Sequence, residues 1–363
     1  MIKITFIATL AYNYFFPGKV RQAGGHTRIY NLARKLAEKP EFEVSCVVGD
    51  FGQPAVVVKD GVRLIKAPID SPVSFFNVLY ILWRLNSDVY IDFIASPRLL
   101  LLYILRMINK SKYIFLTGSE NDVNNRYGEV ENALFGRAYV FGLKRSDAVI
   151  SQVPRHVEML KRNFGIESQL VLSPYFDIQA YEPCEKNTIL WVGRAATYKR
   201  PEIFVDIVKS FLKYKFVMIC NESPYDNDFM NSIKKRLPSL PNLTFHDYVT
   251  YPEMERYYKE AKLLVNTSDY EGFPNTFIEA AIHYTPIVSL NSDPNGMFSI
   301  HSCGICCNGI FQKMANAIEA IAASEEIQKR FGENAFNYAK QNHQLTDAVA
   351  KFDLIIQDVL NRR

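Results

Sequence analysis

The sequence KLLVNTSDYEGFPNTFIEAAIHY, residues 262–284, combines a strand, a turn and a helix. Its first seven residues are typical of a buried strand, and TFIEAAIHY favours a helix whose N-cap we expect to be Asn275 or Thr276. The unpaired N–H groups of such a helix start suit a phosphate. Glu271 in the turn and Glu279 in the helix would then bind hydroxyls on either side of that phosphate. The alternative for each carboxylate is an ordinary solvated surface position.

The composition is that of a soluble globular protein. With 363 residues, 48% of them hydrophobic and 22% charged, we expect about two domains. The most apolar stretch, residues 99–108, is too short and too closely flanked by charges to span a bilayer, and the N-terminus has no cleavage site for export. Cys303, Cys306 and Cys307 lack a second ligand pair with zinc spacing, so we expect reduced thiols and no metal. The sequence thus predicts a cytoplasmic protein.

The net charge of +4 is unevenly distributed. Residues 1–175 contain 22 Lys and Arg against 15 Asp and Glu, and the remainder contains 20 against 23. A basic first half favours association with an anionic membrane surface or an anionic acceptor, and a merely basic surface is the alternative. The basic residues are scattered rather than gathered in a stripe, which argues against nucleic acid.

Strand-like and helix-like segments alternate along most of the chain, which predicts an α/β fold with parallel sheets. The pattern ends near residue 174 and restarts at TILWVG, and the intervening SPYFDIQAYEPCEKN lacks periodicity, as a linker does. We expect two doubly wound, Rossmann-like domains, residues 1–173 and 174–344. A final helix, residues 345–363, is expected to pack on the first domain.

Two clusters at expected strand ends suit phosphate binding. Gly24, Gly25 and His26 stand at the start of a long helix, and paired glycines allow a phosphate to approach the backbone. The spacing does not fit the GxGxxG fingerprint of dinucleotide enzymes. Arg194 ends the first strand of the second half and Lys199 follows five residues later, so both could contact a leaving diphosphate and stabilise its developing charge. A turn and two solvated basic residues are the alternatives.

A polar loop in the first half could serve an acceptor hydroxyl. TGSEND, residues 117–122, follows the strand-like YIFL, and Glu120 or Asp122 could orient or deprotonate a hydroxyl there. Polar residues are common at strand ends, so the loop alone decides little. No histidine shows a Ser or Cys partner pattern, and the G-x-S-x-G and Walker sequences are absent, which disfavours hydrolase and P-loop functions.

Together these residues resemble the family 4 glycosyltransferases, retaining enzymes with the GT-B fold of two Rossmann-like domains facing each other across a cleft. GGHTRIYNLARKLAEK resembles the first-helix motif of that family, and ILWVGRAATYKRPE resembles its Gly-Arg and Lys loop. The segment around DYEGFPNTFIEAA is similar to its most specific signature, a Glu, seven residues and a second Glu. The resemblance covers nearly the whole chain.

The resemblance implies a role for each matching residue. Glu271 would contact the donor sugar and Glu279 the nucleotide ribose, while Arg194 and Lys199 would hold the donor diphosphate. Arg194, Lys199 and Glu271 are therefore the candidate catalytic residues. The candidate donor-binding residues are Gly24, Gly25, Gly193, Gly272, Phe273, Pro274, Asn275, Thr276, Glu279, Tyr248 and Val249. The candidate residues on the acceptor side are His26, Glu120 and Asp122.

The sequence departs from the family pattern in two places. Many members have a His at the end of the strand that here reads YIFLTGSE, where this chain has Gly118 or Ser119. Either Glu120 or Asp122 takes over its contacts, or catalysis does not need that group. The segment LNSDPNGM, residues 290–297, also differs from the Gly-rich loop that is common there.

The sequence thus predicts a retaining, metal-independent glycosyltransferase without a cofactor. It would move a sugar from a nucleotide-diphosphate donor to a hydroxyl acceptor, a glycan or lipid-linked glycan in cell-surface polysaccharide or oligosaccharide synthesis. Peripheral association with the inner face of the cell membrane would follow from the basic first half. The alternatives are a GT-B epimerase acting on the nucleotide sugar and a non-catalytic glycosyltransferase-like scaffold.

Overall fold

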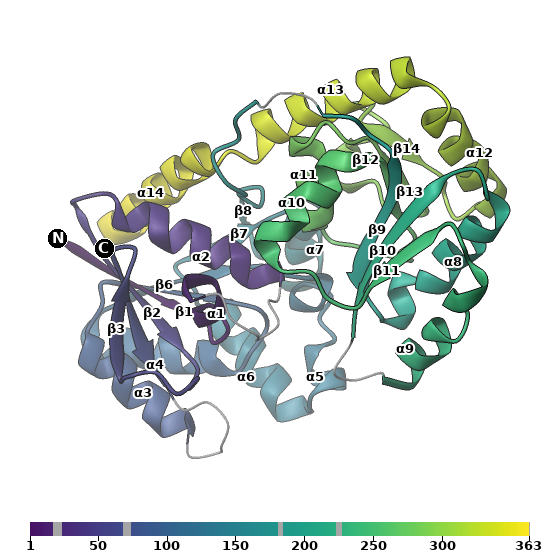
Figure 1. The fold of residues 1–363 in the computed structure, drawn as a ribbon. Helices are drawn as coiled ribbons and strands as arrows, with labels where there is room; N and C mark the ends of the chain where they lie inside the picture. The colour runs from purple at the N-terminus through teal and green to yellow at the C-terminus, as the bar shows by residue number, and fades with distance from the viewer. Residues whose placement is uncertain (17–23, 68–73, 181–183, 223–226, 363) are drawn as a thin grey trace. The chain divides into compact units, whose positions relative to one another are not determined.

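The computed structural model describes the chain except residues 17–23, 68–73, 181–183, 223–226 and 363 (Figure 1). Its contacts divide the chain into two compact units. Unit 1 comprises Met1–Asp177 and His343–Arg363, and unit 2 comprises Ile178–Asn342. Each unit contains one sheet covered by helices, as the alternating sequence pattern predicts.

Unit 1 has an eight-stranded sheet in the order β3-β4-β2-β1-β5-β6-β7-β8, parallel except for the β3–β4 hairpin. The strands are β1 Ile2–Ile7, β2 Phe42–Val48, β3 Val56–Lys59, β4 Val62–Lys66, β5 Val89–Phe93, β6 Lys112–Leu116, β7 Ala148–Ser151 and β8 Gln169–Leu170. The helices are α1 Tyr12–Phe15, α2 Gly24–Ala37, α3 Ser74–Leu85, α4 Arg98–Asn109, α5 Tyr127–Val130, α6 Ala133–Leu143, α7 Pro154–Phe164 and α14 Leu345–Asn361, with the 3-10 turn η1 Glu120–Asp122.

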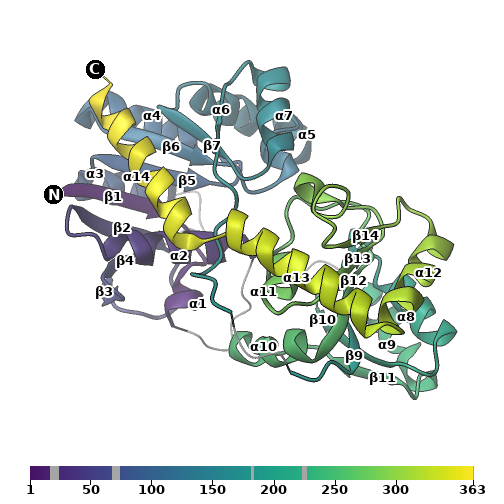
Figure 2. The same ribbon diagram turned by 90° about the horizontal axis from the view of Figure 1, so that it is seen from above.

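The central strands of unit 1 are buried on both faces, because side chains alternate along a strand and each face is covered by helices. In β5, Val89 and Ile91 pack in the core beneath α2 and α14, whereas Tyr90 packs in the core beneath α3, α4 and α6. The C-terminal helix α14 thus belongs to unit 1 and lies along α2 (Figure 2). Lys39, just after α2, forms an ion pair with Asp353 of α14.

Unit 2 has a six-stranded parallel sheet in the order β11-β10-β9-β12-β13-β14. The strands are β9 Thr188–Arg194, β10 Lys215–Asn221, β11 Leu243–His246, β12 Ala261–Asn266, β13 Ile287–Ser289 and β14 Gly304–Cys306. The helices are α8 Pro201–Ser210, α9 Asn227–Lys234, α10 Tyr251–Glu260, α11 Asn275–Ile282, α12 Phe311–Ala322 and α13 Glu325–Asn342, with the 3-10 turns η2 Thr197–Lys199, η3 Leu237–Ser239 and η4 Pro294–Gly296.

The strand order of the second sheet places two loops that carry candidate site residues beside one another. β9 and β12 are hydrogen-bonded neighbours that run in the same direction, with Leu190 opposite Leu264. Their carboxyl ends therefore lie at the same edge of the sheet, and this is the edge at which open α/β sheets bind ligands. The loop after β9 carries Arg194 and Lys199, and the loop after β12 carries Glu271.

Candidate functional site

The carboxyl end of β9 presents Gly193 and Arg194. Trp191, two residues earlier, is buried, and its Nε1 donates to Thr267 Oγ1 at 2.9 Å. A Cβ at position 193 would lie 2.8 Å from the Trp191 ring, so a larger residue there would displace the ring. The exposed guanidinium of Arg194 donates to the hydroxyl of Tyr198 at 3.2 Å and forms no ion pair with any described residue. Most of its donors therefore remain available to an anion.

Lys199 is held at the end of η2 by its backbone. Its carbonyl oxygen accepts a hydrogen bond from Thr267 Oγ1 at 2.7 Å, and its amide N–H donates to the carbonyl of Ala196 at 2.9 Å. Arg200 follows with a φ of 51°, which turns the chain into α8 at Pro201. The side chain of Lys199 is 18% exposed, so the ammonium group is close to the surface with little freedom.

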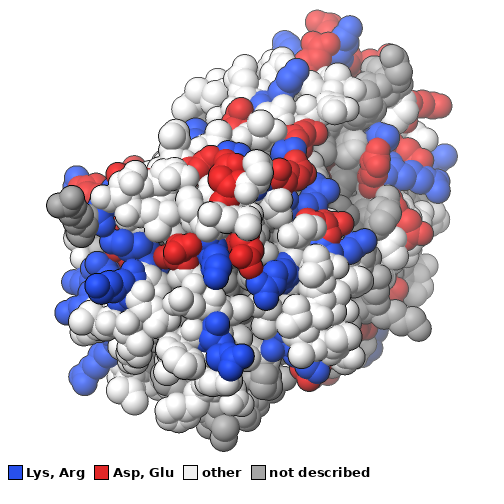
Figure 3. Space-filling model, turned by 90° about the vertical axis from the view of Figure 1, so that its left-hand side faces the viewer, with Lys and Arg blue, Asp and Glu red and all other residues white. Residues whose placement is uncertain are grey.

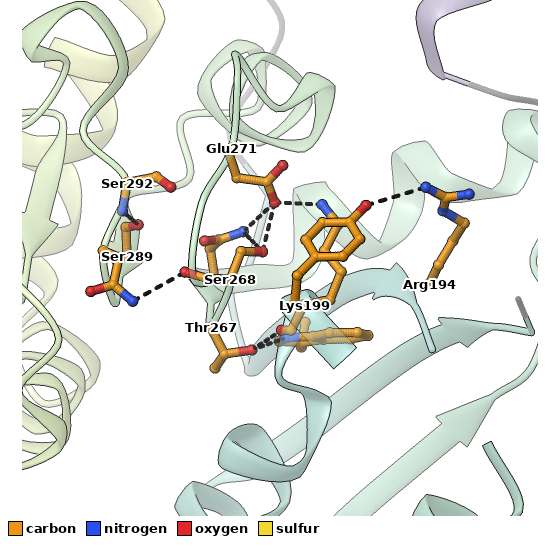
Figure 4. A network of polar contacts seen from close by, with 11 residues as sticks. Arg194, Lys199, Thr267, Ser268, Glu271, Ser289 and Ser292 are labelled. Atoms are coloured by element: carbon orange, nitrogen blue, oxygen red, sulfur yellow. Dashed lines mark hydrogen bonds and ion pairs between the residues drawn. The ribbon is translucent and has the colours of Figure 1, made fainter. Parts of the chain in front are cut away.

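Glu271 is the centre of the polar network in Figure 4. Its Oε1 pairs with the ammonium of Lys199, accepts from Ser268 Oγ at 2.6 Å and lies 3.4 Å from Asn266 Nδ2. Asn266 also donates to Ser268 Oγ at 3.2 Å. With a side chain only 10% exposed, Glu271 is a preoriented carboxylate next to a cation. The structure thus brings Lys199 and Glu271, 72 residues apart in sequence, into direct contact.

The helix after this turn begins one residue earlier than an Asn275 cap would require and two earlier than a Thr276 cap would, so both of these expected N-caps are wrong. The N-cap of α11 is Pro274, with φ −67° and ψ 127°, and it makes no side-chain cap. The ring of proline fixes φ, and its carbonyl accepts from the N–H of Phe277, so Asn275 and Thr276 become the first two helical residues. Their N–H groups have no acceptor within the helix, as at any helix start.

Glu279 lies one turn further along α11 and has different partners from Glu271. Its Oε2 accepts from the hydroxyl of buried Tyr258 at 2.5 Å, and its carbonyl oxygen lies 2.6 Å from His283 Nδ1. The rings of Tyr258 and His283 stack in parallel 5.9 Å apart. Glu279 is therefore oriented by α10 and α11, and Glu271 by the loops after β9 and β12.

The remaining predicted donor residues of unit 2 line the surrounding loops. Tyr248 is 45% exposed and Val249 is half-buried in the loop after β11. Just before them, His246 Nε2 lies 3.2 Å from the hydroxyl of Tyr257. In the turn after Glu271, Gly272 is half-buried, and Phe273 is buried with its ring parallel to that of Tyr338 at 6.4 Å.

The predicted glycine cluster of unit 1 lies at the start of a helix, as the sequence indicates. α2 begins at Gly24, so Gly24 and Gly25 belong to its first turn. A Cβ at Gly25 would meet the ring of Phe93 at 3.5 Å, an ordinary contact. His26 is buried, with its ring edge-on to Phe93 at 4.8 Å. This start of α2 follows residues that the structure does not describe.

Glu120 and Asp122 differ in accessibility. Asp122 is buried, and its carboxylate accepts from the N–H groups of Ala95, Gly118 and Ser119 at 2.6–2.7 Å. Burial raises the pKa of Asp122 although these N–H groups oppose the shift. Glu120 is half-buried and pairs with Arg155 at 3.1 Å. Asp122 therefore fixes the loop after β6, and Glu120 is the carboxylate of the two that can reach a ligand.

A buried network behind this loop was not predicted from the sequence. His156 Nδ1 lies 2.8 Å from Thr117 Oγ1, and Arg28 Nη1 donates to the carbonyl of Thr117 at 3.1 Å. Gln152 Nε2 donates to the carbonyl of Gly118 at 2.6 Å. Burial lowers the pKa of His156 to about 4 and that of Arg28 to about 10. A signal was available, because Thr117 directly follows a buried strand and His156 lies on the helix that follows the next strand.

The sequence also gave no reason to single out the hydroxyl and amide groups that hold Lys199 and Glu271. Asn266, Thr267 and Ser268 form the run NTS at the end of buried β12, and all three are buried. A polar run directly after an apolar strand is the signal that could have identified them, since buried polar groups need partners.

The cysteine cluster packs in unit 2. Cys303 and Cys307 flank β14 and are buried, which raises their thiol pKa values to about 12 and about 11. Across the described residues, no group of three or more His, Cys, Asp or Glu is arranged to hold a metal ion. Nor does any helix in the described part of the chain combine the length and apolarity needed to cross a membrane.

The two α/β units have the architecture of the GT-B fold. Residues 186–324, most of unit 2, match the sequence model of the family described as Glycosyl transferases group 1. This match covers β9, η2, the Glu271 turn and α11. It confirms the resemblance to glycosyltransferases for that part of the chain, while membership of family 4 stays a prediction.

Similar proteins agree with this class. Over 168 residues the chain is 25% identical to mannosylfructose-phosphate synthase of Agrobacterium fabrum, a match that covers 39% of this chain and 37% of that protein. The fold matches sucrose-phosphate synthase from Thermosynechococcus elongatus with a TM-score of 0.80 at 15% identity, over the full length of both chains. Anabaena HepE, solved in complex with UDP and glucose, matches with a TM-score of 0.73 at 12% identity over 99% of this chain and all of that one. At these identities the structural matches establish the GT-B fold.

Proposed function

We propose that this protein is a retaining glycosyltransferase that moves a sugar from a nucleotide-diphosphate donor to a hydroxyl acceptor. The observation that carries the proposal is the Lys199–Glu271 pair in the network of Asn266 and Ser268, beside the unpaired guanidinium of Arg194. At one edge of the sheet, the two cations could bind a diphosphate, and the preoriented carboxylate could bind the sugar joined to it.

The ion pair of Lys199 and Glu271 suits a ligand that offers both charge and hydroxyls. A diphosphate would draw the ammonium of Lys199 toward its oxygens, and Glu271 Oε1 would then accept a hydrogen bond from a sugar hydroxyl in its place. Ser268 still donates to that carboxylate, so its orientation would persist. The same residues can therefore bind the two halves of a nucleotide sugar without leaving a buried charge unpaired.

In the proposed reaction, the bond from the anomeric carbon to the diphosphate oxygen breaks and a bond to the acceptor oxygen forms on the same face of the sugar, while the acceptor proton passes to the leaving diphosphate oxygen. Negative charge develops on the leaving diphosphate, and Arg194, Lys199 and the start of α11 at Asn275 supply positive charge for it. Because these groups provide the stabilisation, we propose that no divalent metal and no cofactor are needed.

Glu279 would bind the nucleotide ribose, with Tyr248 and Val249 at the edge of the base. The hydroxyl of Tyr258 donates to Oε2 of Glu279 and orients the carboxylate that would accept from a ribose hydroxyl. Glu120 is the preferred residue of unit 1 for an acceptor hydroxyl, because the oxygens of Asp122 are bonded to three backbone N–H groups. A glycan or lipid-linked glycan is the proposed acceptor, and a lipid-linked one would place the reaction at a membrane surface.

A transfer screen tests the proposal. Wild-type protein is incubated with UDP-, GDP- and ADP-sugars and a panel of glycan acceptors, and nucleotide release is compared with and without acceptor. We expect acceptor-dependent release with one donor class, and a loss of about 100-fold or more in Glu271→Gln and Lys199→Ala. Lys213→Ala is the matched control, because it breaks the exposed ion pair with Glu319 in the same unit.

Three outcomes of the screen would contradict the proposal. Turnover of donor without acceptor and with altered sugar stereochemistry would indicate the epimerase instead. An inverted anomeric configuration in the product would exclude retention. If no nucleoside diphosphate stabilised the protein in a thermal-shift assay, the result would indicate a scaffold protein.

A further inference from the structure

Three neighbouring helices of unit 1, α3, α4 and α6, contain no acidic residue. At the average of the whole chain, 38 Asp and Glu in 363 residues, helices of 12, 12 and 11 residues would together contain about four. They contain four arginines instead, namely Arg84, Arg98, Arg106 and Arg137. The helices form one layer on one face of the sheet, because α4 packs against both α3 and α6 and all three cover the same core (Figure 1). We call this layer the α3–α4–α6 face.

Large apolar side chains protrude from the same layer. Phe76, Tyr80 and Trp83 of α3 follow one another at helical spacing and are 69%, 56% and 45% exposed. Met107 near the end of α4 is 68% exposed, and Leu134 at the start of α6 is 72% exposed. Exposed apolar residues that occur singly need no explanation, but a set on adjacent helices marks an interaction surface.

The cations of the α3–α4–α6 face lie among these aromatic rings. The guanidinium of Arg84 is 5.9 Å from the ring centre of Tyr80, and that of Arg145, just after α6, is 3.6 Å from the ring centre of Phe141. Among the described residues, neither arginine forms an ion pair with a carboxylate. No carboxylate in the described part of the chain therefore neutralises their positive charge by direct pairing.

Two further exposed cations extend the charge of this layer. Arg137 lies on α6 and Lys144 is its C-cap, and neither pairs with a carboxylate among the described residues. Elsewhere in unit 1 cations do pair with carboxylates, as Arg63 does with Glu43. Figure 3 shows Lys and Arg as well as Asp and Glu on the side of the molecule that it draws. Arg98 and Arg106, by contrast, are partnered by Asp92 and Asp147 and contribute less to the field.

We propose that the α3–α4–α6 face docks on a membrane surface containing anionic phospholipid. Trp, Tyr and Phe side chains that protrude among Arg and Lys suit the headgroup region, where rings and aliphatic tips enter the acyl boundary and cations meet phosphates. Protein interfaces instead have cores depleted of charge and a polar rim, whereas here cations and aromatics are interleaved on α3 and around α6. The inference is independent of the proposed donor site, which lies in unit 2.

Sedimentation with vesicles tests this inference with the full chain. Wild-type protein should pellet with vesicles of phosphatidylcholine and phosphatidylglycerol, pellet poorly with phosphatidylcholine alone, and be released by salt. The double variant Arg137→Glu/Lys144→Glu should bind about 25-fold or more weakly, from about fivefold for each cation removed. Its control, Lys329→Glu/Lys351→Glu, changes the net charge equally at exposed positions on α13 and α14 and should bind as wild type.

A second pair of variants tests the apolar contribution. Leu134→Ser on the α3–α4–α6 face should weaken vesicle binding by about tenfold, whereas Leu354→Ser on α14, where the leucine is 71% exposed, should leave it unchanged. Circular dichroism confirms that each variant is folded. Equal binding to both vesicle types, no binding to either, equal losses in variants and controls, or binding to polyglutamate but not to vesicles would each overturn the inference.

Discussion

Replacing Thr267 by Val should destabilise unit 2 through two hydrogen bonds. Thr267 is fully buried, and its hydroxyl accepts from Trp191 Nε1 at 2.9 Å and donates to the carbonyl of Lys199 at 2.7 Å. Valine keeps the shape of the side chain but leaves a buried N–H and a buried carbonyl without this partner. Each lost bond with its unsatisfied group costs about 1–2 kcal/mol, so we expect the free energy of unfolding to fall by about 2–4 kcal/mol.

Urea unfolding can be followed at the site itself. The chain has two tryptophans, Trp83 in unit 1 and Trp191 beside Thr267, so a Trp83→Phe background makes the fluorescence report on unit 2 alone. With a urea dependence of about 2–3 kcal/mol per M for a unit of this size, the midpoint should fall by about 1 M. Thr244→Val, at an exposed position of β11 in the same unit, is the control and should leave the midpoint unchanged.

The prediction for Thr267 also has a functional part. Because its hydroxyl holds the backbone of Lys199, Thr267→Val should weaken nucleotide binding as well as stability, although the residue touches no ligand in the proposed complex. A midpoint change below about 0.2 M would refute the two buried hydrogen bonds. If the free energy of unfolding fell as predicted but nucleotide affinity stayed unchanged at a temperature where the variant is folded, the proposal that Thr267 positions Lys199 would be refuted.

Two further predictions concern the ribose side of the site and the buried histidines. Tyr258→Phe removes the donor to Glu279 Oε2 and should weaken nucleotide binding, measured by calorimetry, by about fivefold to tenfold. Unchanged or tighter binding would contradict the assignment of Glu279 to the ribose. Burial lowers the pKa values of His156 and His343 to about 4, so below the unfolded value of about 6.5 the unfolded chain takes up protons first and stability is lost as the pH falls. Each histidine should lower the free energy of unfolding by about 2 kcal/mol between about pH 7 and about pH 5. In His156→Asn, urea unfolding should lose about that much of its pH dependence. An undiminished dependence would mean that His156 is not buried as a neutral ring.

The alternating pattern of the sequence predicted most strands of both sheets, because long apolar strands and amphipathic helices have distinct periods. The edge strand β3 was missed, since its four residues are mostly exposed and carry no burial pattern. A signal existed in the pair Asp60-Gly61, which forms the two-residue hairpin turn between β3 and β4 with positive φ values of 52° and 76°.

β14 was missed because it lies within the cysteine cluster, where Cys303, Cys306 and Cys307 were weighed as zinc ligands. The backbone at Gly304 passes so close to β13 that a Cβ there would lie 1.9 Å from the carbonyl oxygen of Ile287, which explains the glycine in this strand. Three residues are too few for an alternating pattern to be visible in a sequence.

The candidate site was predictable in residue type but not in its contacts. Arg194, Lys199 and Glu271 stand out because charged residues directly follow expected strands. Their partners are set by the sheet order β9-β12, which places loops about 70 residues apart in sequence side by side. The sequence predicts that both sheets are parallel, but it contains no local signal for which strands are neighbours. The hydroxyls of Thr267 and Ser268 acquire their roles only through that order.

Calorimetry with UDP, GDP and ADP tests the central claim, that unit 2 binds the diphosphate of a nucleotide sugar through Arg194 and Lys199. We predict that one nucleoside diphosphate binds the wild-type protein and the control Lys213→Ala with equal affinity. Arg194→Ala and Lys199→Ala should each bind it about tenfold or more weakly, since a hydrogen bond to a charged group contributes about 1.5–3 kcal/mol. Absence of binding by all three nucleotides, or equal affinity in all four proteins, would contradict the account.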